Sequence, residues 1–207
     1  MSSQIRQYRL KVRAERQAAT RQRIVEATAA LHEEVGPART TVAEIARRAG
    51  VQRLTVYNNF PNETELFDAC GQHWTNLNPT PDPSAALAIV DPDERVRAVL
   101  GPLFRWYRKH AQAIEHLQRD RLVMPAFDAV MRIRMDQQFA HLADALSSGF
   151  APNGRRAKRV RAVVALALDF WTWRRLANEG MSDQDAASVM VGAVKASAQD
   201  PPLTAQR

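Results

Sequence analysis

Apolar residues recur along this chain at intervals of three and four positions, and no stretch of any length alternates as a β-strand does. Such spacing places an apolar stripe along one face of a helix. The pattern therefore predicts an all-α fold. Helices are expected over residues 20–35, 41–50, 52–59 and 62–77, and then from 91, over 111–121, 126–148 and 155–178, and from 182. Gly101–Pro102 is expected to bend or interrupt the helix that begins near residue 91.

Residues 41–60, TVAEIARRAGVQRLTVYNNF, form the clearest pair of short helices. Thr41 and Glu44 make a capping box, in which each side chain satisfies a backbone N–H at the helix start. Gly50 can adopt the left-handed conformation that ends this helix. The outer face of the second helix carries groups suited to base edges and phosphates in a major groove. The predicted DNA-binding residues are Thr41, Gln52, Arg53, Leu54, Thr55, Tyr57, Asn58 and Asn59.

This segment resembles the DNA-binding domain of TetR-family transcriptional regulators. The resemblance spans roughly residues 21–74 and rests on RIVEATAALHEEVG, IARRAGV, TVYNNF and NETELF. Gln52 stands where the family usually has Ser, which is a better N-cap. Glu63 stands where the family usually has a phosphate-contacting Lys; it suits the helix dipole but repels DNA. The structural alternative is an ordinary helical hairpin with polar outer faces.

Basic residues are concentrated in the N-terminal part. Residues 1–60 contain 11 Lys and Arg against 5 Asp and Glu, whereas residues 61–207 contain 18 against 17. Attraction to DNA phosphates requires such an uneven distribution. Residues 1–20 form either a disordered tail or the exposed start of the first helix. We expect a partly ordered extension that seeks phosphates, although such an arm can also enter a minor groove.

Three prolines within residues 78–84, NPTPDPS, mark the clearest boundary in the chain. We predict a DNA-binding domain over residues 1–77, with its basic extension at 1–20 and its helix-turn-helix at about 41–60. Residues 78–207 follow as a helical domain. The resemblance implies that this second domain binds an effector and dimerises.

The segment 155–178 is apolar on two faces, so both faces must be covered. One stripe contains Val160, Val163, Val164, Ala167, Phe170 and Trp171, and the other contains Ala162, Leu166, Trp173 and Leu176. The second stripe is expected to face a partner. As in the resembling family, two helices from each of two chains would form a four-helix bundle. The alternative is a core within one chain.

Aromatic and methionine side chains of the C-terminal part, Phe139 among them, could line an apolar cavity. The predicted effector-binding residues are Trp106, Tyr107, Met124, Phe127, Met131, Met135, Gln138, Phe170 and Trp171. Core packing explains any single one of them equally well, and only the resemblance implies an enclosed inducer. Gln138 is the sharpest candidate, because a buried amide among apolar neighbours needs hydrogen-bond partners.

Catalytic and metal-binding motifs are not found: the sequence has no HExxH, no Gly-rich phosphate loop and no cysteine cluster. We therefore expect no enzymatic activity, no cofactor and no metal site. The single Cys70 is expected in a core, and it fits a reducing cytoplasm. No apolar run reaches the length of a membrane span, and the basic N-terminus lacks the apolar region of a secretory signal. His32, beside two glutamates, is expected on an exposed face.

Together these features predict a homodimeric, cytoplasmic, TetR-like transcriptional repressor that binds a palindromic operator. An apolar or amphipathic effector would shift the two recognition helices from a spacing near one DNA turn, about 34–36 Å, and release the DNA. The first alternative is a DNA-binding protein without a small-molecule switch. The second is a helical enzyme that carries a basic hairpin.

Overall fold

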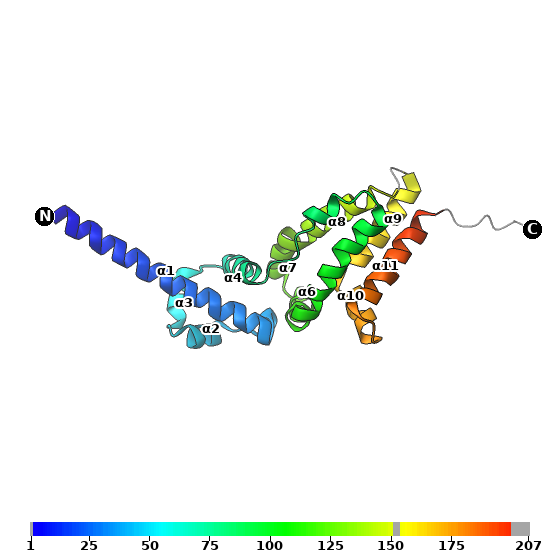
Figure 1. The fold of residues 1–207 in the computed structure, drawn as a ribbon. Helices are drawn as coiled ribbons and strands as arrows, with labels where there is room; N and C mark the ends of the chain where they lie inside the picture. Colours follow the sequence, from blue (N-terminus) through cyan, green and yellow to red (C-terminus); the bar gives the residue numbers. More distant parts are fainter. Residues whose placement is uncertain (1, 151–153, 200–207) are drawn as a thin grey trace, which may run out of the picture. The chain divides into compact units, whose positions relative to one another are not determined.

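The computed structural model describes residues 2–150 and 154–199, and every regular element among them is helical. The all-α prediction is thus confirmed. The chain divides into two compact units (Figure 1). The first unit contains the chain up to Pro79 together with Gln112–Met131. The second contains Thr80–Ala111 and the chain from Arg132 on.

The first unit is built on one long helix, α1, which spans Ser2–Glu34. The predicted start near residue 20 is therefore wrong, and the extension is the exposed beginning of this helix. The unit also contains η1 (Pro37–Arg39), α2 (Val42–Ala49), α3 (Arg53–Asn59), α4 (Glu63–Leu77), α7 (Pro125–Met131) and the last turns of α6 (Pro92–Asp120).

The core of the first unit joins α1 to the helix-turn-helix and α4. Its buried side chains include Ile24, Val25, Leu31, Ile45, Val56, Phe60, Leu66 and Cys70. In Figure 1, α2 and α3 lie together against α1, and the N-terminal turns of α1 extend beyond them. Burying each such side chain contributes about 1.5–3 kcal/mol, which holds the two short helices on their support.

Three side chains at the end of α6 bind the end of α1 and the turn after it. His116 Nδ1 donates to the Glu33 carbonyl at 2.9 Å, and Arg119 Nη2 donates to the Val35 carbonyl at 3.1 Å. The Asp120 carboxylate accepts from the Ala38 N–H at 2.9 Å. The last carbonyls of a helix lack partners within it, so these donors complete the end of α1.

His32 is buried with 6 % of its surface exposed, so the prediction of an exposed face is wrong. Its ring contacts Phe67 and Phe127, and its Nδ1 lies 3.6 Å from the Cys70 sulfur. Burial lowers the pKa of His32 to about 4, against a weaker opposing effect of the Asp120 charge. The imidazole is therefore neutral at pH 7 and packs as part of the core.

The second unit contains the following elements: α5 (Ser84–Leu87), most of α6, the π-helix η2 (Arg132–Asp136), α8 (Gln137–Ser147), α9 (Gly154–Leu168), α10 (Phe170–Asn178) and α11 (Asp183–Ala198). Pro102 stays inside α6, and the non-helical dihedral angles occur at His110 instead, with φ −114° and ψ 18°. The interruption predicted as one outcome at Gly101–Pro102 is therefore not found there, and the helix is kinked at His110. The helix predicted over residues 111–121 is confirmed, because the kink at His110 separates residues 111–120 from the first part of α6.

The helix predicted over 126–148 is observed as a continuous helical run from Pro125 to Ser147, but its middle, η2, is wound as a π-helix between α7 and α8. The helix predicted over 155–178 breaks at Asp169, which has extended dihedral angles and caps α10 by accepting the Thr172 N–H. The break leaves the Leu168 carbonyl free to accept from the Tyr107 hydroxyl at 2.6 Å. As a result the apolar stripes of α9 and α10 no longer continue along one face, as they would in a single helix.

Candidate functional site

The helix α3 presents a polar surface above two buried anchors. Val56 and Phe60 are 2 % and 3 % exposed and lie in the core of the first unit. On the outer side Arg53 and Asn58 are exposed, and Tyr57 is 55 % exposed. An arginine can bind guanine O6 and N7 together, and an asparagine can bind adenine N6 and N7. Both groups are exposed on the outer face of α3.

The turn before α3 has the predicted backbone. Gly50 adopts φ 66° and ψ 40°, and Val51 N–H donates to the Ala46 carbonyl at 2.9 Å. At the start of α2 the Thr41 hydroxyl accepts from the Glu44 N–H at 3.2 Å. The Glu44 carboxylate, however, binds Arg47 at 2.9 Å, so the reciprocal half of the predicted capping box is replaced by an ion pair.

The remaining predicted DNA-binding residues are placed unequally. Gln52 and Leu54 are exposed, and Gln52 makes no side-chain cap, as expected of Gln in place of Ser. Thr55 is half-buried. The Asn59 amide turns back onto its own helix and donates to the Thr55 carbonyl at 2.7 Å. Asn59 therefore stabilises the end of α3 and, in this conformation, does not present its amide outward.

Arginines of α1 fix this helix to the helix-turn-helix. The Arg21 guanidinium lies 4.0 Å from the centre of the Phe60 ring, and Arg23 Nε donates to the Ala49 carbonyl at 3.2 Å. A salt bridge of 2.6 Å joins Arg48 to Glu34. These contacts restrict how α2 and α3 can rotate against α1.

The exposed N-terminal turns of α1 carry a stripe of arginines. At 3.6 residues per turn Arg6, Arg9, Arg13 and Arg16 fall within an arc of about 80°, with Glu15 on the opposite side. None of the four arginines makes a hydrogen bond or ion pair with a described residue. The stripe is thus a continuous cationic edge on the unit that carries α3.

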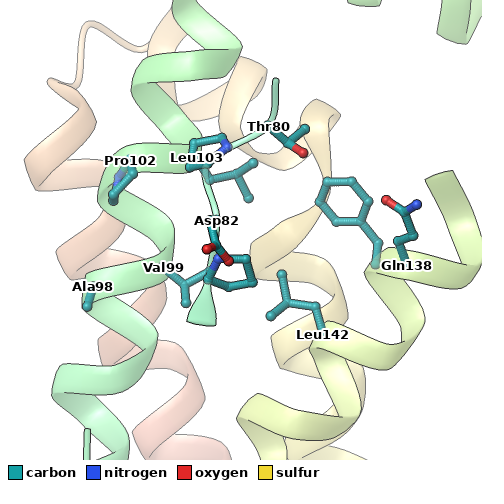
Figure 2. A pocket seen from close by; sticks show the side chains of 11 residues that line it. Thr80, Asp82, Ala98, Val99, Pro102, Leu103, Gln138 and Leu142 are labelled. Carbon is teal, nitrogen blue, oxygen red and sulfur yellow. The ribbon is translucent and has the colours of Figure 1, made fainter. Parts of the chain in front are cut away.

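A pocket of about 130 Å³ lies within the second unit, between α6, α8 and the segment before α5 (Figure 2). Its lining residues are Thr80, Pro81, Asp82, Pro83, Ala98, Val99, Pro102, Leu103, Gln138, Phe139 and Leu142. Of the side chains predicted to line a cavity, only Gln138 and Phe139 line it. Gln138 is solvent exposed at the side of the pocket, so the prediction that its amide is buried is wrong.

The other predicted effector-binding residues are not gathered in this pocket. Tyr107 and Phe170 pack on each other in the second unit beside Trp106, and Trp171 is 46 % exposed. Met124, Phe127 and Met131 belong to the first unit, and Met135 lies in η2, half-buried. Sequence reasoning missed the pocket because its wall includes the proline-rich segment, whose composition predicts only a domain boundary.

Apolar side chains remain exposed on α9 and α11, two helices that pack on each other (Figure 1). Leu166 of α9 is 54 % exposed and Val189 of α11 is 46 % exposed. Trp173 is instead 1 % exposed, contacts Tyr107 and Phe170, and donates to Asp183 at 3.0 Å. The prediction that Trp173 faces a partner is therefore wrong, because the break at Asp169 turns it inward.

Residues 24–70 match the family model described as "Bacterial regulatory proteins, tetR family". No curated protein matches the chain significantly. None of the described helices has the length and hydropathy needed to cross a membrane.

Solved structures share the fold. A TetR-like transcriptional regulator from Rhodococcus sp. RHA1 is 20 % identical, with 84 % of this chain and 93 % of that chain covered and a TM-score of 0.56. A tetR-family regulator from Streptomyces coelicolor is 19 % identical, with coverages of 86 % and 79 % and a TM-score of 0.61. A third, from Syntrophomonas wolfei, is 13 % identical, with coverages of 89 % and 97 % and a TM-score of 0.61.

Each of these three proteins is described as a transcriptional regulator. The family match lies on the helix-turn-helix unit, and the structural similarity extends over most of both units. Residues 24–70 are thus similar to the DNA-binding part of the tetR family, and the chain shares its fold with these solved regulators.

Proposed function

We propose that the protein is a dimeric transcriptional repressor that binds a palindromic operator and is released by a small amphipathic molecule. The observation that carries the proposal is the arrangement of α3, with Val56 and Phe60 anchored in the core and Arg53, Tyr57 and Asn58 exposed. A short helix held in this way can enter a major groove with its outer face against the bases.

Charge supports the same proposal. The arginine stripe of α1 lies on the unit that carries α3 and can neutralise phosphates beside the bases that α3 reads. Phosphate contacts position a protein on DNA without specifying sequence. Glu63 is exposed at the N-terminus of α4, where a family lysine would meet phosphate. The stripe would compensate for that lost contact.

Dimerisation is supported by the exposed apolar residues of the last helices. Leu166 and Val189 lie on helices that pack on each other, and Gly192 and Ala193 of α11 are small enough to allow close approach of a second copy. A two-fold dimer would present two α3 helices to two half-sites, which matches the symmetry of a palindrome.

The pocket of the second unit is the proposed effector site. It combines apolar side chains with a few polar groups, as ligand sites do. Gln138 can donate and accept hydrogen bonds there. An effector would release DNA only to the extent that it binds the released conformation more tightly than the DNA-bound one.

The test of the DNA-binding proposal is selection of bound fragments from genomic DNA with wild-type protein and with Arg53→Ala. If Arg53 reads a guanine, the variant should lose about 1–3 kcal/mol per half-site and relax one base pair of the selected motif. Tyr57→Phe is the matched control, because loss of a phosphate contact should weaken all sequences about equally. Failure of the wild-type protein to enrich any motif would refute the proposal.

A further inference from the structure

The charge in the lining of the second unit's pocket is of one sign, negative. Asp82 is the only ionisable residue among those that line it, and no lysine or arginine takes part. The whole chain carries a formal net charge of +7. A negative pocket in a basic protein is not explained by the overall composition, so its charge is a local property of this site.

The Asp82 carboxylate has one oxygen available for a ligand. The Ser84 N–H and hydroxyl both donate to its Oδ1, at 2.9 Å and 2.6 Å, whereas Oδ2 receives no hydrogen bond from a described residue. These hydrogen bonds from Ser84 lower the pKa of Asp82. The carboxylate is therefore ionised at pH 7 and held in a fixed orientation.

The polar and apolar groups are arranged for an amphipathic molecule. Figure 2 shows the Asp82 carboxylate between Val99 of α6 and Leu142 of α8, with Gln138 farther along α8. Val99 and Leu103 are largely buried, whereas Thr80, Asp82 and Gln138 are solvent exposed. The pocket thus has an apolar wall and a polar side open to water.

The size of the pocket limits the apolar body. Its volume of about 130 Å³ is close to that of an engineered apolar cavity of roughly 150 Å³ that holds benzene. An ammonium group offers three hydrogen-bond donors and no acceptor, which suits the acceptor oxygens of Asp82, Gln138 and Thr80. A carboxylate ligand would meet Asp82 with no cation in the lining to offset the repulsion.

We propose that this pocket selects small primary ammonium compounds, with the charged group at Asp82 and a body of about one ring between α6 and α8. This inference rests on the proposed effector site and names the chemical class of its ligand. The binding energy divides between apolar contact with Val99, Leu103, Phe139 and Leu142 and one charge-assisted hydrogen bond at the carboxylate.

The test compares three probes that share a phenyl ring and differ in charge: phenethylammonium, phenethyl alcohol and phenylacetate. Titration calorimetry on the full chain should give a Kd roughly three- to fivefold lower for the ammonium than for the alcohol, with phenylacetate weakest. Asp82→Asn keeps the size of the side chain and an acceptor for Ser84, and it should abolish this order. The matched control is Asp91→Asn, since Asp91 also accepts a backbone N–H two residues later in the second unit but does not line the pocket.

Three results would overturn the inference: equal affinities for the three probes, an ammonium preference that survives Asp82→Asn, or no binding of any probe at millimolar concentration. The proposed function fails on a different measurement, the selection of genomic DNA. A chain that enriches an operator but shows no ammonium preference contradicts this inference alone. A chain that prefers the ammonium but enriches no DNA contradicts the regulator alone.

Discussion

Two junctions in this molecule each turn the chain between consecutive helices, but different interactions hold the two turns. Between α2 and α3 the chain turns at Gly50, whose positive φ and two backbone hydrogen bonds end α2 locally. Between α9 and α10 the chain turns at Asp169 without any glycine. There the freed Leu168 carbonyl is bound by Tyr107, a residue 61 positions earlier in the sequence.

The consequences for function differ as well. The first junction turns α3 so that its polar face remains in solvent, where it can meet DNA. The second junction rotates α10 so that Trp173 enters the core, while Leu166 of α9 stays exposed. The junction at Gly50 depends on local conformation and leaves a polar helix face exposed. The junction at Asp169 depends on a distant contact, and it decides which apolar side chains are buried in the core and which stay exposed.

The largest expected effect on stability distinguishes the buried Trp173 from the exposed Leu166. Trp173→Glu should prevent folding of the second unit, because an unpaired charge in a core costs more than about 3–5 kcal/mol. Leu166→Glu should keep the helix content, since the new charge lies on the exposed side of α9. It should yield monomers, because that side is the proposed dimer interface. Circular dichroism and light scattering measure the two outcomes. A folded, dimeric Leu166→Glu protein would remove this residue from the interface.

Acid should weaken the first unit through His32. The folded pKa of about 4 lies below the usual value of 6.5, so the unfolded chain binds the proton more readily. Stability is therefore fully present above pH 6.5 and falls towards pH 4, by about 3 kcal/mol in total. Urea unfolding of wild type and His32→Gln across this range tests the sign. Equal pH dependence in both proteins would show that His32 is not the group responsible.

Tyr107→Phe should destabilise the junction between α9 and α10 without creating a cavity in the core. The variant removes the hydroxyl that donates to the Leu168 carbonyl and leaves that buried acceptor without its partner, at a cost of about 1–3 kcal/mol. Burial raises the pKa of Tyr107, so the phenol remains the donor at neutral pH. Hydrogen exchange should increase at the start of α10 and remain unchanged in α2 and α3. Unchanged protection in α10 would mean that Asp169 alone maintains the break.

Gly50→Ala should have the smallest effect, and it changes only the backbone conformational energy of the junction between α2 and α3. A Cβ at this position would meet no atom within 4 Å, so the cost is the left-handed conformation alone, about 1–2 kcal/mol. Thermal unfolding should report this loss while the binding of phenethylammonium stays unchanged. A cost well above that range would indicate that the turn moves, and DNA affinity should then fall too.

Local sequence determined the helices, their caps and the helix-turn-helix of this protein. Thr41, Gly50 and Asn62 act through backbone groups within a few residues of themselves, so their positions suffice to predict where α2 ends and α4 begins. The outward placement of Arg53 and Asn58 follows from the same short-range periodicity. These features require no knowledge of the rest of the fold.

Tertiary structure decided the breaks and the site in the C-terminal part. The π-helix at Arg132–Asp136 changes the winding of a helical segment, and the break at Asp169 ends one, although the apolar periodicity of both segments is continuous. The break is held by a donor from another helix. The pocket gathers Asp82, Val99 and Leu142 from segments far apart in the chain. Such contacts depend on how helices pack, which a periodic pattern does not encode, because one apolar stripe serves equally well as core, interface or pocket wall.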